Sequence, residues 1–374
     1  MRMAKTTEVM STRQLAGILF MMRTTVVISF VPLITTGSAA QDAWAAGLIA
    51  GLLLTLAAWV VAGLAARYPK LTVIDYSRML LGRFFGTVVS LAISWHFLLI
   101  AATDIRIYAE LMRVAFMPNT PIWFTTLAMV FLASLAAWFG IEPIGRAAEA
   151  FLPFFVAFIA LTLLGAAPSV NVQNLQPALA RGPGPIFSSV WTPLSIGLQW
   201  VSVGMLFPQL TPKDQRVRSA VVAAAVSSAV LAVVAAVLVG VLGTSLSSKS
   251  LFPFLKMARS VKPTRTIERI EILGTVAWGL GLFAGGSTMV YCGSRAMAQI
   301  LRIQESRKVV PAFGALVALH AMYAYKDAFE LVGFFRPPGF PLLIALTAGV
   351  PYALMWASHV ARHLVRRHFG RQGR

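Results

Sequence analysis

The sequence predicts an all-α, polytopic membrane protein with about ten transmembrane helices. Hydrophobic residues make up 58% of the 374 residues, charged residues make up only 12%, and the mean hydropathy is +0.76. An ordinary soluble domain has roughly 25% charged residues, so most of this chain is not built for contact with water. The apolar residues gather in runs of about 20, which is the length of a helix that crosses a bilayer.

Ten such runs follow one another along the chain. They cover about residues 14–36, 43–66, 84–115, 121–140, 147–167, 186–208, 219–243, 270–298, 308–325 and 339–361. Turn-forming sequences such as Gly37-Ser38 and Arg336-Pro337-Pro338-Gly339 separate them. The connections are too short to hold a folded catalytic domain, so residues 1–374 are expected to form a single transmembrane domain.

The distribution of positive charge predicts the orientation in the membrane. The net charge is +19, and with the N-terminus inside, the inner segments hold 20 lysines and arginines and the outer segments nine. Cytoplasmic loops are enriched in these residues, so both termini are expected to be cytoplasmic. The basic residues lie between apolar runs instead of forming one face, so we expect the lipid bilayer and no nucleic acid as a partner.

One outer segment, residues 251–262, departs from this rule because it carries basic residues outside. Four of its apolar residues recur at helical spacing: Leu251, Phe254, Leu255 and Ala258. Lys256 and Arg259 lie among them, which is typical of a short amphipathic helix at the interface or capping the bundle. A plain basic loop is the alternative.

No combination of residues is typical of a catalytic centre. The chain has no phosphate-binding glycine loop, no metal-ligand spacing and no serine–histidine–acid set in suitable surroundings. Its one cysteine, Cys292, can form neither an intrachain disulfide nor a zinc site by itself. We therefore expect no enzymatic activity, no cofactor and no bound metal.

Short motifs occur in order along nearly the whole chain. They are Ser11-Thr12-Arg13-Gln14-Leu15, Gln41-Asp42-Ala43-Trp44, Arg67-Tyr68-Pro69, Ile74-Asp75-Tyr76, Leu81-Gly82-Arg83, Gly140-Ile141-Glu142, Asn174-Leu175-Gln176-Pro177 and Glu268-Arg269. Together they resemble the endospore germination permease family, the B subunits of spore germinant receptors. That family is similar to the amino acid–polyamine–organocation transporters.

The resemblance implies a leucine-transporter-like fold of two inverted five-helix repeats. The repeats would cover about residues 14–167 and 186–361, followed by a basic cytoplasmic tail at 362–374. It also implies interruptions of the first and sixth spans in mid-membrane. Small ligands bind at such interruptions, because half-helix N-termini and freed backbone groups point at them.

The sixth span carries its own signs of an interruption. Pro193 removes a backbone donor, Gly197 loosens the helix four residues later, and the hydroxyls of Thr192 and Ser195 can replace the lost hydrogen bonds. A simple proline kink is the alternative. The first span reads Arg23-Thr24-Thr25-Val26 at the corresponding depth and lacks glycine, so a continuous helix and an unwound one are both open there.

Charged residues inside the third span fall into two groups. Arg106, Glu110 and Arg113 have i,i+4 and i,i+3 spacing, which predicts a triad that neutralises itself and is structural or faces another subunit. Asp104 points almost oppositely and has no partner on its own face. Arg23 lies near the bilayer centre, where an arginine costs roughly 2.5–3.5 kcal/mol, so it needs a partner or a wet cavity.

We hypothesise that Arg23 and Asp104 pair beside a ligand pocket, the alternative being that each meets water separately. The pocket is expected among the first, third, sixth and eighth spans. Its candidate residues are Thr24, Thr25, Ile100, Asp104, Tyr108, Ser195, Gly197, Gln199, Ser202, Ser287 and Tyr291. Tyr291 is included because it falls on a tyrosine position of the family pattern.

The resemblance implies a subunit that senses a small nutrient, such as an amino acid, in mid-membrane. It implies A-type and lipoprotein C-type receptor subunits as partners, and the inner spore membrane as location, with both termini on the spore core side. A secondary transporter for an amino acid or amine is the alternative, because one fold can serve both functions.

Overall fold

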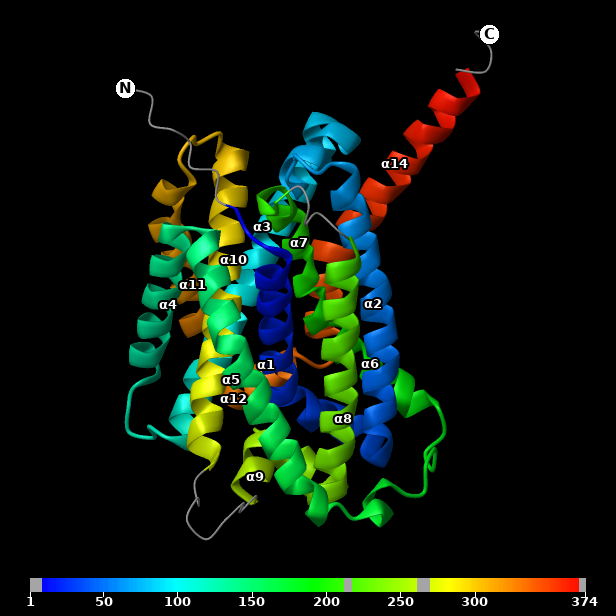
Figure 1. The fold of residues 1–374 in the computed structure, drawn as a ribbon, viewed down its shortest axis with the longest axis vertical. Coiled ribbons are helices and arrows are strands. Elements are labelled where there is room, and N and C mark those ends of the chain that lie inside the picture. Colours follow the sequence, from blue (N-terminus) through cyan, green and yellow to red (C-terminus); the bar gives the residue numbers. More distant parts are fainter. Residues whose placement is uncertain (1–8, 212–216, 261–269, 370–374) are drawn as a thin grey trace.

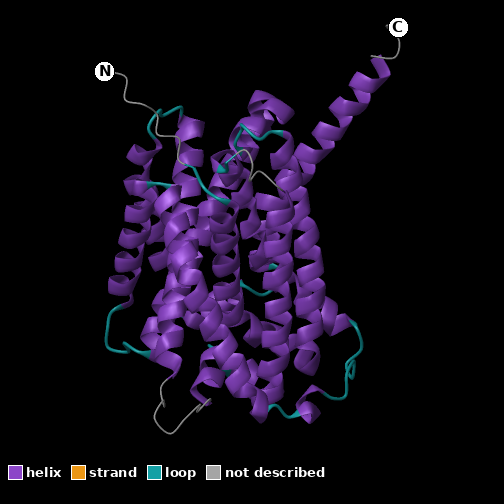
Figure 2. Cartoon of the chain, in the orientation of Figure 1, coloured by secondary structure: helices purple, strands orange, loops and turns teal. Residues whose placement is uncertain are grey.

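The computed structural model describes residues 9–211, 217–260 and 270–369, which form an almost entirely helical bundle (Figures 1 and 2). In this part of the chain the β-structure consists of an isolated bridge between Met10 and Leu210. The first half contains α1 (Thr12–Ala39), α2 (Ala43–Arg67), α3 (Val73–Ala115), α4 (Ile122–Phe139) and α5 (Ile141–Ala166).

The second half begins with α6 (Gly184–Gly197), the 3-10 segment η4 (Leu198–Ser202) and α7 (Val203–Leu206). It continues with α8 (Val217–Lys249), α9 (Pro253–Ser260), α10 (Ile270–Leu301), α11 (Val310–Tyr323), α12 (Ala328–Phe334), α13 (Gly339–Ile344), the π-helical segment η8 (Ala345–Gly349) and α14 (Val350–Phe369). Each of the ten predicted spans coincides with one or more of these elements to within a few residues, and the chain is a multi-pass membrane protein.

By length and apolar composition alone, seven helices of the described chain can cross a membrane, or eight if a pair bent by 106° at the α11–α12 junction counts as one span. This is fewer than the ten predicted. One of the seven runs from Val31 to Arg67 and so counts the end of α1, η1 (Ala40–Asp42) and α2 as one span, although the backbone at Ala40 is not helical (φ 53°).

Local sequence explains where several helices begin and bend. Ser11 and Thr72 begin α1 and α3 with capping boxes. In each box the hydroxyl of the cap residue accepts a hydrogen bond from the backbone N–H of the third helical residue. The side chain of that third residue accepts from the backbone N–H of the cap residue. Gly82 (φ 80°) and Gly243 (φ 68°) have left-handed backbone angles that glycine tolerates. They bend α3 and α8 close to the predicted span ends at 84 and 243.

The predicted interruption of the sixth span is present as a change of helix type. The α-helix ends at Gly197, and the five residues of η4 continue it as a tighter 3-10 helix. A methyl group at Gly197 would come within 2.6 Å of the Leu54 side chain, so glycine allows α2 to pack closely here. The first span, in contrast, is continuous: α1 runs through Arg23 and Thr25 without a break, and the Thr25 hydroxyl donates to the Met21 carbonyl (2.6 Å).

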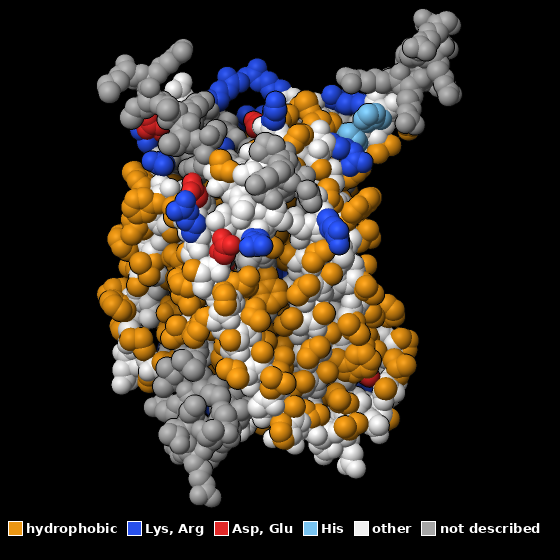
Figure 3. All heavy atoms as spheres, in the orientation of Figure 1, with side chains coloured by type: hydrophobic (Ala, Val, Ile, Leu, Met, Phe, Trp, Pro, Cys, Tyr) orange, Lys and Arg blue, Asp and Glu red, His pale blue; other side chains and the backbone are white. Residues whose placement is uncertain are grey.

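The two described ends of the chain lie at the same end of the bundle (Figure 1). On the face shown in Figure 3, basic side chains gather at this end and apolar side chains cover the middle. The predicted tail that starts at residue 362 is helical as far as Phe369. It forms the last part of α14, which extends away from the bundle (Figure 1). At the centre, α1 contacts α5, α6, α8 and α10, and α10 packs against α3.

Candidate functional site

Four segments meet around the carboxylate of Asp104 in the middle of α3. A methyl group at Gly285 of α10 would lie 3.2 Å from Asp104 Oδ2 and 3.0 Å from Met22 Cγ of α1. Gln199 of η4 reaches the same carboxylate, with its Nε2 3.4 Å from Asp104 Oδ1. The site therefore combines α1, α3, η4 and α10, which are the first, third, sixth and eighth predicted spans.

The polar atoms of this centre are buried and only partly paired. Asp104 is 2% exposed and Gln199 is 1% exposed. Asp104 Oδ2 and Gln199 Oε1 have no hydrogen-bond partner among the described residues. A buried polar group normally has a partner, since leaving it unpaired costs about 1–3 kcal/mol. Such an arrangement is suited to a ligand that brings hydrogen-bond donors.

Helix α1 is held against α10 beside this centre. Trp278 Nε1 donates to the Thr25 carbonyl (3.0 Å) and lies 2.8 Å from Ser29 Oγ. Gly281, one turn further along α10, leaves no room for a methyl group beside the Thr25 side chain. Thr25 therefore lies at the predicted junction, but its hydroxyl donates to Met21 within α1 and its carbonyl accepts from Trp278.

Aromatic side chains cover this junction at the end of the bundle opposite to the described chain ends. The Trp278 ring packs edge-on against Phe252 (6.0 Å between centroids) and Phe254 (6.1 Å), and Phe254 also meets Phe158 of α5 (5.9 Å). Phe254 belongs to α9, which contacts α1, α5, α8 and α10. The amphipathic helix predicted within 251–262 is thus present, and it caps the bundle.

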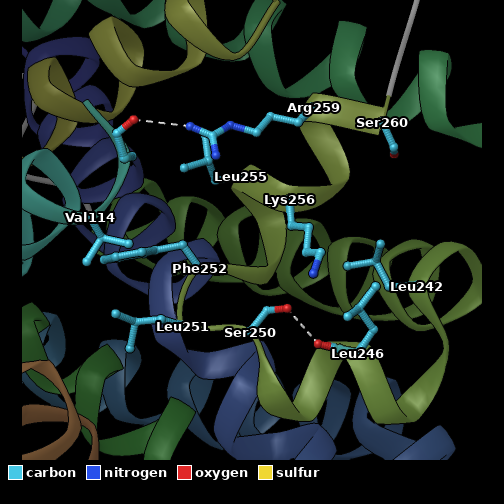
Figure 4. A pocket seen from close by; sticks show the side chains of 11 residues that line it. Val114, Leu242, Leu246, Ser250, Leu251, Phe252, Leu255, Lys256, Arg259 and Ser260 are labelled. Carbon is cyan, nitrogen blue, oxygen red and sulfur yellow. Dashed lines mark hydrogen bonds between the residues drawn. The ribbon is translucent and has the colours of Figure 1, made fainter. Parts of the chain in front are cut away.

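A separate groove lies beside α9 (Figure 4). Its walls come from the ends of α3 and α8 and from α9, and Lys256 extends toward Leu242 and Leu246. Arg259 donates to the Ala115 carbonyl (3.2 Å) and thereby ties the cap to α3. This groove does not include any of the predicted ligand-binding residues.

The hypothesis that Arg23 and Asp104 form an ion pair is wrong. Arg23 is fully buried, but its Nη1 donates to Ser227 and Ser228 of α8, at 2.9 Å each. Successive residues of a helix are rotated by about 100°, so Arg23 leaves α1 in a different direction from Met22, which faces Asp104. The two serines on α8 were the missed signal, because hydroxyls inside an apolar span need a polar partner.

The predicted triad on α3 is confirmed. Arg106 Nη2 and Glu110 Oε1 are 2.9 Å apart, and Arg113 Nη2 and Glu110 Oε2 are 2.8 Å apart. Arg106 Nη1 also donates to the carbonyl of Ala321 (2.9 Å) near the end of α11. This set of charges satisfies itself and fastens α3 to the α11–α12 bend.

Four of the remaining candidates are buried hydroxyl residues that fall into two groups. Ser195 and Ser202 are buried, and their hydroxyls donate to carbonyls of the same helix, at Thr192 and Gln199. Thr24 and Ser287 are buried with hydroxyls that have no partner in the described part of the chain.

Three further candidates lie on α3 and α10. Ile100 is buried one turn from Asp104 on α3. Tyr108 lies one turn to the other side, and a methyl group at Gly279 would be 3.2 Å from its ring. Tyr291 accepts from Arg295 (2.7 Å) along α10, six residues beyond Gly285. Met22 is a wall of the centre that was not predicted from the sequence.

Comparison with known proteins supports both fold and family. The profile of the family described as "Spore germination protein" matches residues 9–329. Spore germination protein YndE of Bacillus subtilis (strain 168) is 25% identical over 77% of this chain and 77% of its own length. Spore germination protein KB of the same organism is 27% identical over 69% of this chain and 71% of its own length.

Among solved structures, MhsT in complex with L-phenylalanine has a TM-score of 0.65 and 14% identity, over 92% of this chain and 98% of its own. A substrate-bound Na+-coupled sialic acid symporter has a TM-score of 0.62 and 13% identity, over 90% of this chain and 79% of its own. These likenesses show the leucine-transporter-like fold. The profile match covers most of the chain, so the chain belongs to the spore germination protein family of permease-like membrane proteins.

Proposed function

We propose that this chain is the germinant-sensing membrane subunit of a spore germination receptor. A small nutrient, most simply an amino acid, would bind at the Asp104 centre, where α1, α3, η4 and α10 meet. The observation that carries this proposal is the buried, incompletely paired set of polar atoms on Asp104 and Gln199. They lie where the sixth predicted span changes from an α-helix to a 3-10 helix.

Two further observations support a ligand of this size and class. The structure of MhsT, which has the same fold, is described as a complex with L-phenylalanine, an amino acid. In this chain, the α9 cap and the Trp278 ring close the centre on one side, so a bound solute would be enclosed. An enclosed site without a catalytic set suits recognition better than chemistry, and no enzymatic activity or cofactor is proposed.

Binding would act as a signal by shifting the balance between two arrangements of the bundle. A ligand shifts such a balance only by its different affinity for the two states. The change of helix type at Gly197 is the natural place for the movement, since a 3-10 turn is held by poorer hydrogen bonds than an α-helical turn. A-type and lipoprotein C-type subunits in the inner spore membrane would receive the signal, and both termini would lie on the core side.

The experiment is nutrient-triggered germination of spores that carry Ser195→Leu or Thr25→Leu. Thr25 and Ser195 are buried on α1 and α6, which contact each other, so the bulkier leucine is expected to raise the half-maximal concentration of the activating nutrient by at least about tenfold. Ser188→Leu is the matched control, because Ser188 lies on the same helix but is exposed. An unchanged response in both test variants contradicts the proposal.

The second candidate function is secondary transport of an amino acid or amine. It is favoured by the fold shared with a Na+-coupled symporter. Uptake of labelled amino acids into vesicles that contain this chain alone separates the two functions. Accumulation against a gradient favours transport, whereas ligand binding without accumulation favours sensing.

A further inference from the structure

We infer that the ligand of this chain carries a positively charged amino group, and that the Asp104 carboxylate is its counter-charge. The inference rests on the proposed ligand site at the Asp104 centre and goes further by naming the chemical class that the site selects. Neutral sugars, nucleosides and simple carboxylic acids are thereby excluded as ligands at this position.

Charge balance inside the bundle supports a cationic ligand. A buried charge requires an opposite charge, because desolvation costs several kcal/mol per ion. Glu110 is compensated by Arg106 and Arg113. Arg23 does not reach Asp104: its Nη1 donates to two serines on α8, and its Nε and Nη2 have no partner among the described residues. Asp104 makes no salt bridge in the described chain and accepts one long hydrogen bond, from Gln199 (3.4 Å). A cationic group on a bound ligand would supply the opposite charge that the described chain does not provide to Asp104.

The polar atoms left unpaired at this centre are hydrogen-bond acceptors. Asp104 Oδ2 and Gln199 Oε1 are both acceptors, and their side chains are joined by the Gln199 Nε2–Asp104 Oδ1 contact. A primary ammonium group has three N–H donors and no acceptor, so one such group can satisfy both oxygens. Hydrogen bonds between ionised partners are also about twice as strong as neutral ones.

The close packing around Asp104 limits what can approach it. Gly285 lets α10 pack close to the carboxylate, since even a methyl group there would lie 3.2 Å from Asp104 Oδ2 and 3.0 Å from Met22 Cγ. One turn away on α3, the Tyr108 ring reaches Gly279 of α10 in the same α3–α10 contact. A small group such as a primary ammonium therefore suits this position better than a bulky one.

The experiment is thermal unfolding of the purified full-length chain in nanodiscs, followed by tryptophan fluorescence. The probes are ethylamine, L-alanine and L-valine, each compared with a partner that lacks the amino group: ethanol, L-lactate and 2-hydroxyisovalerate. Sodium and potassium chloride are tested separately. The variants are Asp104→Asn, which removes the charge at nearly constant shape, and Glu142→Gln, a matched control at a half-exposed ion pair far from the centre.

At least one amine probe is expected to raise the Tm of the wild type and of Glu142→Gln. Asp104→Asn should need at least about tenfold more of that probe, since a hydrogen bond to a charged group is worth about 1.5–3 kcal/mol. The partner molecules without the amino group should have no such effect. The inference is overturned if no amine probe distinguishes the wild type from Asp104→Asn, if the partner molecules act equally well, or if the salts alone act through Asp104.

Germination assays separate failure of this inference from failure of the proposed function. If Ser195→Leu spores lose their response to a nutrient that has no amino group, the ligand site stands and the inferred class is wrong. If Asp104-dependent amine binding is measured but germination is unchanged in Asp104→Asn and Ser195→Leu, binding stands and the sensing function is wrong.

Discussion

Helix α3 carries two sets of buried charged residues, of which one is neutralised by ion pairs and the other is not. Arg106 and Glu110 lie within 2.9 Å of each other, and Arg106 also donates to a carbonyl of α11. Two residues before Arg106, Asp104 is equally buried but accepts one bond of 3.4 Å and has an unpaired oxygen in the described chain. The contrast suggests that compensated charge fastens helices, whereas uncompensated charge is kept for a molecule that is not part of the chain.

The largest effect is expected from Glu110→Ala, which removes the centre of the compensated set. Removing one partner of a buried ion pair costs about 3–5 kcal/mol, because Arg106 would remain buried without its counter-charge. Unfolding of the purified chain with increasing denaturant measures the loss. The double variant Arg106→Met/Glu110→Leu should recover most of the stability, since both charges are then gone. A Glu110→Ala protein as stable as the wild type would refute the structural role.

A smaller effect, confined to binding, is expected from Gly285→Ala. The added methyl group would lie 3.0–3.2 Å from Met22 and Asp104 and would fill the space beside the carboxylate. The nutrient concentration for half-maximal germination should rise about tenfold, with a stability change below about 1 kcal/mol. Gly37→Ala on α1 is the control, because a methyl group there meets no atom within 4 Å. Equal responses in the two variants would mean that the space beside Asp104 holds no ligand.

Asp104→Asn should change ligand-free stability in the direction opposite to Glu110→Ala. The substitution removes an uncompensated buried charge, so the free energy of unfolding is expected to rise by about 1 kcal/mol. The measurement is denaturant unfolding without any amine or nutrient present. Breaking a buried ion pair costs about 3 kcal/mol or more, as expected for Glu110→Ala. A loss of about that size in Asp104→Asn would show that Asp104 has a structural role, and the contrast between the two sets of charge would then disappear.

The smallest effect is expected from Arg113→Gln at the edge of the compensated set. Arg113 is 41% exposed although its partner Glu110 is buried, so water screens their interaction. The expected loss of stability is about 0–1 kcal/mol. If the loss equals that of Glu110→Ala, then Arg113 and not Arg106 is the main counter-charge of Glu110.

Much of the fold could be predicted because its signals are local. The ten apolar runs, the capping residues Ser11 and Thr72 and the bends near Gly82 and Gly243 depend on residues a few positions apart. The triad on α3 could also be predicted, since its i,i+3 and i,i+4 spacings decide contact within one helix.

The partners of single polar residues could not be predicted in this way. Arg23 meets serines 204 and 205 positions away, and Asp104 meets Gln199 across 95 positions. A spacing within one helix says which face a side chain occupies, but not which other helix lies opposite that face. An Arg23–Asp104 pair was a reasonable prediction because the helix opposite each residue was not known. In the structure the two side chains point toward different neighbouring helices.

The sequence by itself determined that this chain lies in lipid, how its helices are divided and which charges on α3 neutralise each other. Those properties follow from composition and from the repeat of the helix. Only the tertiary structure decided that α1 is continuous, that Arg23 turns to α8 and that Asp104 meets Gln199 beside Gly285. These outcomes depend on how closely helices approach and how they are rotated, which packing of the whole bundle sets.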